Sequence, residues 1–314
     1  RPRTMASSFN TLAGMRAQIT TPLLLLSLLA INTEAFHVSP LPLSSPPAFA
    51  KLPASAGRVV KANFARSVRA VGSFIPETNP DARVASTKDA PVLQDPIILE
   101  DPTTKERVTV RMDGAHVQSY MTPDYDVFFT RPDAVFDGSK PVSGGVPICW
   151  PQFGPGDMQQ HGFARNLKWE CTDVRAERPG GMTALSWSRN TQRAVYELIH
   201  TKETLKMWDS RFQARYQVEL SGGSLNLELR VHNKGVEPLT FTGALHTYFS
   251  VDDLEKLQIK GPFKGKKYLD KTCDPVEEKE ETEGAVMIDG FTERVYQDVA
   301  GKGTIEGGGK SGVL

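Results

Sequence analysis

The sequence predicts an all-β protein, an antiparallel β-sandwich or barrel, on three observations. From about residue 95 onward, short runs of alternating apolar and polar residues recur, which is the period-two pattern of strands with one buried face. Turn residues separate these runs at near-regular spacing. No long segment has the 3.6-residue apolar period of an amphipathic helix.

The candidate strands can be justified in chain order. In the first region Val108, Val110 and Met112 share one face. Later, Gly222 and Gly223 separate two alternating runs, which predicts a β-hairpin. The candidate strand regions are residues 96–136, 183–189, 214–235, 239–251 and 256–263.

Composition excludes some functions. The 314 residues include 37 Lys+Arg and 37 Asp+Glu, so the chain is formally neutral and a nucleic-acid binder held by bulk charge is excluded. A small anionic substrate needs only one or two well-placed cations and stays open. The three cysteines, Cys149, Cys171 and Cys273, form no CxxC pair, so we expect buried or half-buried free thiols and no metal site.

Residues 1–90 have the composition of a presequence and disordered linker, which leaves 91–314 as the folded domain. The apolar run 22–31 is shorter than the roughly 20 residues that span a bilayer and is typical of a signal peptide. Residues 37–71 are rich in Ser, Pro, Ala, Lys and Arg without any acidic residue, as in transit peptides. We expect a two-part presequence that directs the protein to a plastid, with secretion as the alternative, and a mature protein that is not embedded in a membrane.

The loop at 150–170, WPQFGPGDMQQHGFARNLKWE, gathers polar groups among glycines and prolines. The Gln160 amide and the His161 imidazole can hydrogen-bond sugar hydroxyls, and the planar Arg165 guanidinium can bind a carboxylate or phosphate. A surface loop whose polar groups only face water is the alternative.

Two further segments carry candidate groups. His246 lies in an apolar strand pattern, where a satisfied core histidine is the common case. A half-buried imidazole that titrates near neutral pH can also act as a general acid. Glu293 precedes Arg294 at the start of a short alternating run, where an exposed ion pair of small energetic value is the plain interpretation.

The segments DGSKPVSGGVPICWPQFG, QHGFARN, ALHTYFSVDDLEKLQIKG and TERVYQD occur in this order from about residue 95 onward. Together they resemble the glucose-6-phosphate 1-epimerase branch of the aldose 1-epimerase superfamily. The resemblance implies a galactose-mutarotase-like antiparallel β-sandwich. It also implies exchange between the α and β anomers of a hexose 6-phosphate without a metal or organic cofactor.

The resemblance implies roles for single residues. His246 takes the place of the catalytic histidine, Gln160 of a sugar-binding glutamine and Arg165 of an arginine that helps to hold the phosphate. Glu293 stands where the family has a binding aspartate, and His161 beside Gln160 is a further candidate for sugar contact. The expected partner is a small-molecule sugar phosphate, and we expect a monomer that binds no nucleic acid.

Two departures from the family pattern bear on this expectation. Ser143 stands where the family has an arginine before Gly-Gly, so one phosphate contact is lost or supplied by Lys140 or Lys168, and unphosphorylated hexoses become an alternative substrate. No segment before Leu314 matches the one that carries the family's catalytic glutamate, so we expect a truncated chain, and a non-catalytic sugar-binding module is a further alternative. The acidic run is expected to be a solvated loop: Glu277, Glu278, Glu280, Glu281 and Glu283.

Overall fold

The protein is described by a computed structural model that covers residues 95–136, 140–177, 191–288 and 290–306, together with the backbone of 12–19 and 62–65. The described residues form strands with very little helix, and every pair of named strands is antiparallel, which confirms the predicted all-β class. The helical elements are a six-residue helix, α1 (Lys202–Met207), and a single 3₁₀ turn, η1 (Ala164–Asn166).

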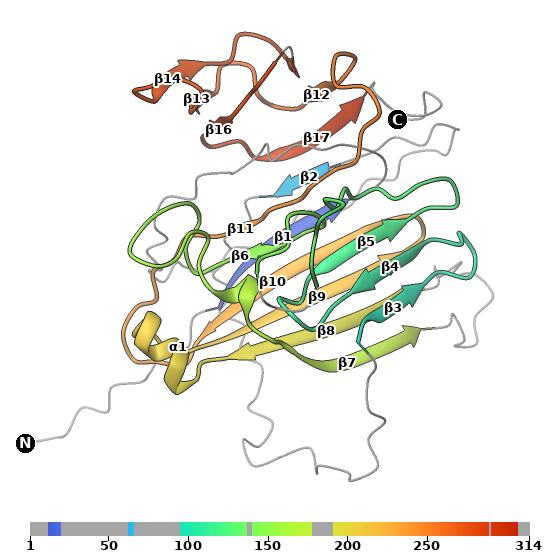
Figure 1. Cartoon of the computed structure of the whole chain (residues 1–314), viewed down its shortest axis with the longest axis vertical. Coiled ribbons are helices and arrows are strands. Elements are labelled where there is room, and N and C mark those ends of the chain that lie inside the picture. The colour runs from blue at the N-terminus through green and yellow to red at the C-terminus, as the bar shows by residue number, and fades with distance from the viewer. Residues whose placement is uncertain are drawn as a thin grey trace, which may run out of the picture.

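A long curved sheet forms one layer of the sandwich (Figure 1). Four neighbouring strands at one end of this sheet, with β7 at the edge, are β7 (Glu170–Glu177), β8 (Thr191–Ile199), β9 (Phe212–Ser221) and β10 (Leu225–Asn233). Strands β9 and β10 alternate buried and mostly half-buried residues along their length because one face of the sheet packs on the core. Gly222 and Gly223 lie in the turn between β9 and β10, and both have a positive φ. The predicted hairpin with its glycine turn is therefore confirmed.

The second layer is built from short strands that cover the inner face of this sheet (Figure 1). One three-stranded sheet and one two-stranded sheet supply it, and Val108 and Val110 are fully buried in the core between the layers, with Met112 packed against it. Burial of such side chains contributes roughly 1.5–3 kcal/mol each. The strands are β3 (Ile97–Glu100), β4 (Arg107–Val110), β5 (Val117–Met121), β6 (Ile148–Cys149) and β11 (Ala244–Leu245).

The C-terminal strands enclose a second, smaller core (Figure 1). They are β12 (Gln258–Lys260), β13 (Lys267–Asp270), β14 (Glu277–Glu280), β15 (Ala285–Met287), β16 (Arg294–Tyr296) and β17 (Gly301–Glu306). The acidic run was expected to be a solvated loop, and this is wrong in two respects. Glu277–Glu280 form a strand, and Glu281 is 7% exposed because it accepts hydrogen bonds from Tyr296 Oη at 2.6 Å and Arg294 Nη1 at 3.1 Å.

Two strands precede the folded domain that the sequence predicts. β1 (Leu12–Ile19) pairs with β10, and β2 (Ala62–Ala65) joins β1 to β17. The rest of 1–94 and the candidate strand 183–189 lie outside the described residues, so the domain boundary at residue 90 and the presequence stay predictions. Within the part of the chain that the structure covers, no helix has the length and apolar character needed to cross a membrane. The three cysteines are free, as expected.

Candidate active site

The loop that follows β6 is anchored in the core by aromatic side chains. Trp150 is fully buried, and its ring meets Phe163 edge-on at 6.0 Å between centroids. The Trp150 carbonyl accepts hydrogen bonds from the N–H groups of Phe163 and Ala164. Only glycine fits at Gly162, since a Cβ there would lie 2.4 Å from the Trp150 oxygen. The loop between these anchors is therefore held at both ends, and Trp150 and Phe163 belong to the core.

A buried amide holds the interior of this loop, and the sequence interpretation missed it. Gln152 donates from Nε2 to the carbonyls of Gly154 at 3.1 Å and Met158 at 3.2 Å, and its Oε1 accepts from the Met158 N–H at 3.1 Å. Gln159, which follows Met158, also binds the loop backbone: its side-chain amide donates a hydrogen bond to the Gly162 carbonyl at 3.0 Å. The kinked shape of the loop therefore rests on side chains that bind backbone groups rather than a ligand.

We predict that Gln152→Ala lowers stability by about 1–3 kcal/mol, since it leaves buried loop carbonyls and an N–H without partners. Thermal unfolding followed by circular dichroism measures this loss. Gln159→Ala is the matched control, because Gln159 is exposed and makes one such bond, so its cost is smaller. Equal costs for the two variants would contradict the assigned role of Gln152.

His161 has a defined tautomer at its place in the loop. Its backbone φ is +69°, and its Nδ1 accepts a hydrogen bond from the Gly154 N–H at 3.1 Å, so the proton of the neutral ring is on Nε2. Burial, followed by the positive charges of Arg165 and Lys271 and by His246, lowers the pKa of His161 to about 4. The His161 side chain is therefore a neutral hydrogen-bond donor near neutral pH.

His246 lies beside His161. It directly follows β11, and its N–H donates to the Pro147 carbonyl at 3.0 Å. The two imidazole centroids are 5.7 Å apart, and the Tyr248 ring lies 4.9 Å from His246. His246 Nδ1 is buried and has no hydrogen-bond partner. Burial, with a smaller contribution from Arg165, lowers the pKa of this imidazole.

The predicted binding residues Arg165 and Gln160 interact through the backbone. Arg165 Nη2 donates to the Gln160 carbonyl at 2.8 Å, while Arg165 Nε is buried without a partner. The Gln160 side chain is exposed. The rings of His161 and His246 are in contact, and the positive charge of Arg165 contributes to the lowered pKa of both imidazoles. Gln160 is held at the same loop, with its amide facing solvent.

Glu293 is connected to the site through a lysine that sequence reasoning did not identify. The Lys271 N–H donates to the Glu293 carbonyl at 2.9 Å, and Lys271 Nζ lies 3.7 Å from Glu293 Oε1. Lys271 also contributes to the lowered pKa of His161. Glu293 thus forms a partly exposed ion pair, as in the plain interpretation of the sequence, but its partner is Lys271, because Arg294 pairs with Glu281. No sequence pattern marks Lys271, whose place depends on the pairing of β13 with β16.

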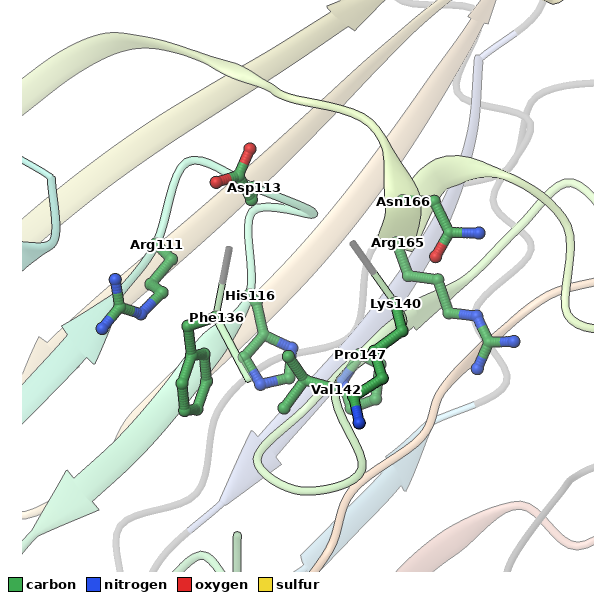
Figure 2. Close-up of a pocket in the computed structure, with 9 residues that line it drawn as sticks. All are labelled: Arg111, Asp113, His116, Phe136, Lys140, Val142, Pro147, Arg165 and Asn166. Atoms are coloured by element: carbon green, nitrogen blue, oxygen red, sulfur yellow. The ribbon is translucent and has the colours of Figure 1, made fainter. Parts of the chain in front are cut away.

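Of the two lysines considered as replacements for the arginine absent at Ser143, only Lys140 lines a cavity together with Arg165 (Figure 2). Lys168 is exposed and forms a backbone bridge with Asp113. Among the described residues, no group of three or more His, Cys, Asp or Glu side chains is placed to hold a metal ion.

Comparisons with known proteins all indicate the same family. Residues 97–301 match the model of the aldose 1-epimerase family. Two curated relatives carry the name "Putative glucose-6-phosphate 1-epimerase". The one from Escherichia coli K12 is 32% identical over 208 residues, which cover 64% of this chain and 63% of the relative. The one from Cenchrus ciliaris is 30% identical over 216 residues, which cover 63% of each chain.

A solved structure of a "putative mutarotase" from Salmonella typhimurium has a TM-score of 0.57 and 27% identity, covering 67% of this chain and 65% of that chain. Slr1438 from Synechocystis, at 24% identity and a TM-score of 0.50, shares the fold. The chain spans 63% of the length of the curated relatives it matches. The fold is mutarotase-like, and the chain belongs to the aldose 1-epimerase family.

Proposed function

We propose that this protein interconverts the α and β anomers of a hexose 6-phosphate by acid–base opening and closure of the sugar ring. The observation that carries the proposal is the pair of imidazoles of His246 and His161, 5.7 Å apart, beside the Arg165 guanidinium in a chain of the aldose 1-epimerase family. The phosphorylated substrate is supported by the names of the curated relatives and by the cations near this pair.

Anomer exchange needs two proton transfers. A base takes the proton of the anomeric hydroxyl while an acid protonates the ring oxygen, and the C1–O5 bond breaks to give the open-chain aldehyde. Rotation about C1–C2 and reclosure with the reverse transfers give the other anomer. We assign the acid to His246, whose buried Nδ1 has no hydrogen-bond partner. Arg165 and Gln160 orient the phosphate and hydroxyls so that the ring oxygen meets the imidazole.

His161 has a different role from His246. A pKa of about 4 makes its imidazolium scarce at neutral pH, so it is a poor proton reservoir. Since Nδ1 already accepts from Gly154, the Nε2–H group is free to donate to a sugar oxygen. We therefore assign His161 to substrate binding rather than to proton transfer.

The state of His246 predicts the pH dependence. The acid form must be protonated, and burial lowers the pKa of His246 below the ordinary value for histidine. We expect kcat/KM to fall as pH rises through this lowered pKa. A bound phosphate dianion offsets the charge of Arg165, so the corresponding fall in kcat is expected at higher pH. Rates measured between about pH 5 and about pH 8 test both the fall in kcat/KM and the fall in kcat. A fall in kcat/KM whose midpoint lies above the ordinary histidine pKa would contradict the acid role of buried His246.

A second candidate function is sugar binding without catalysis. It is favoured by one observation: in the described part of the chain, no carboxylate makes a hydrogen bond or ion pair with His161 or His246. A family enzyme needs a base opposite the acid. Saturable binding of a hexose phosphate without faster anomer exchange would support this candidate.

The test of the proposed function is the rate at which freshly dissolved α-glucose 6-phosphate equilibrates, followed by polarimetry with and without the protein. We expect the rate to rise in proportion to protein concentration and to exceed the rate with glucose. An unchanged rate for both sugars would reject anomerase activity, and equal enhancement for both would reject the preference for phosphate.

A further inference from the structure

Aromatic rings from two segments surround the His246 imidazole. From the loop after β6, the ring centroid of His161 lies 5.7 Å from that of His246, and the Phe153 ring centroid lies 6.4 Å from it. From the segment that carries His246 itself, the Tyr248 ring lies 4.9 Å away, with 32° between the two planes. Planes inclined so little at this distance are offset-stacked rather than edge-on. Among the described residues, Tyr248 therefore makes the shortest ring contact with His246 and turns its face toward the imidazole.

Backbone hydrogen bonds hold both stacked residues in place. The Tyr248 N–H donates to the Gly145 carbonyl at 2.8 Å, and the Tyr248 carbonyl accepts from the Phe129 N–H at 3.0 Å. The His246 N–H donates to the Pro147 carbonyl at 3.0 Å. Because Gly145 and Pro147 belong to one segment, both stacked residues are bonded to the same neighbouring backbone. Their ring contact is therefore a fixed feature of the fold.

The surroundings of His246 disfavour its protonated form. Burial, with a smaller contribution from the positive charge of Arg165, lowers the pKa of the imidazole. His161 is neutral near neutral pH, and burial raises the pKa of the Cys149 thiol, on the strand paired with β11, to about 12. In the ranges that the structure describes, no carboxylate forms an ion pair with His246. Stabilisation of the imidazolium by described neighbours therefore falls to uncharged groups.

The Tyr248 ring can supply this stabilisation. An aromatic face within about 6 Å of a cation attracts it through the ring quadrupole. The phenol itself stays neutral, because burial raises the pKa of Tyr248; Cys149 adds to this rise, and the charges of Arg165 and Arg131 oppose it. Tyr248 therefore acts on His246 through the face of its ring, and the phenolic O–H is not needed for this effect.

We propose that Tyr248 is a positioning residue for the acid: its ring holds the His246 imidazole in place and stabilises the imidazolium by stacking on it. The inference rests on the proposed function in one respect, since the proton that the imidazolium carries is the one given to the sugar ring oxygen. The stacking itself exists with or without a sugar, so it can be measured independently of activity.

The first test is the pKa of His246, measured by NMR titration of its imidazole C–H signal in the full chain; the signal is identified by its loss in His246→Ala. We expect Tyr248→Leu to lower this pKa by about 0.5–1 unit, because the imidazolium loses its attraction to the ring. Tyr248→Phe restores the ring without the O–H and should restore the wild-type pKa. An unchanged or raised pKa in Tyr248→Leu would overturn the proposal. Tyr248→Met, a second apolar replacement without a ring, serves if the leucine variant does not fold.

Phe249→Leu is the matched control. It removes an aromatic ring from the next residue along the same segment, where the ring contacts Phe128 at 6.1 Å between centroids. We expect the pKa of His246 to equal that of the wild type in this variant. A fall in pKa as large as that in Tyr248→Leu would show that loosening of the segment, and not the lost stacking, is the cause, and the proposal would fail.

Kinetics separate this inference from the proposed function. In Tyr248→Leu, the fall in kcat/KM for glucose 6-phosphate should move to lower pH by the same amount as the pKa, which lowers kcat/KM about three- to tenfold above it. Tyr248→Phe should recover this loss. A pH profile that stays in place while the pKa falls would reject the positioning role. If the pKa falls but the wild-type protein does not accelerate anomer exchange, the stacking stands and the proposed function fails.

Discussion

Replacing His246 with alanine is expected to lower kcat for anomer exchange of glucose 6-phosphate by about 10²–10⁴-fold, the range typical of a lost general acid. KM should change little, because the imidazole acts on the ring oxygen in the transition state. The small side chain also leaves the Pro147 hydrogen bond intact, since that bond uses the His246 backbone N–H. Steady-state rates over a range of substrate concentrations separate the two constants.

His232→Ala is the matched control for this variant. His232 is also half-buried with a lowered pKa, but it lies on β10 in the long sheet. We expect its kcat to equal that of the wild type. A loss of similar size in both variants would indicate general destabilisation, and full activity of His246→Ala would remove His246 from the mechanism.

Arg165→Gln is expected to have the second largest effect, an increase in KM for glucose 6-phosphate of about 10- to 100-fold. The estimate follows from a charge-assisted contact of about 1.5–3 kcal/mol. The loss should be smaller for glucose, which has no phosphate. Since Arg165 lowers the pKa of His246, its removal should also move the fall in kcat/KM to higher pH.

Arg215→Gln removes an arginine from β9, where its partner is Glu197 at 3.9 Å, and is the control for lost charge. Its kinetics with both sugars should match those of the wild type. Equal losses for glucose and glucose 6-phosphate in Arg165→Gln would contradict a contact between Arg165 and the phosphate.

Local patterns were enough to predict the class of fold. The hairpin of β9 and β10 was predicted from the alternation of apolar and polar residues on each side of Gly222-Gly223. The alternation and the glycine turn are both local features of the sequence. The acidic run shows where such reasoning fails. Glu281 is buried where the pairing of β13 with β16 brings Tyr296 and Arg294 to it. These partners are distant in the sequence, so the composition of the acidic run could not predict them.

The sequence predicted some residues of the candidate site and missed others. Family motifs indicate His246, His161 and Arg165, and the structure brings them together. Lys271 was missed because it reaches its place through the pairing of distant segments. Gln152 lies in the loop at 150–170 that the sequence marks as polar, but its role as a buried support depends on the path of the loop around it.

The most direct measurement of the central claim is magnetisation transfer between the α and β anomeric protons of glucose 6-phosphate by NMR at equilibrium. It observes ring opening and closure without any coupling enzyme. The account predicts an exchange rate that increases in proportion to the concentration of the wild-type protein. With His246→Ala, the exchange rate should not rise above that in buffer alone. Equal exchange with the two proteins, or none with the wild type, would contradict proton transfer from His246 to the ring oxygen.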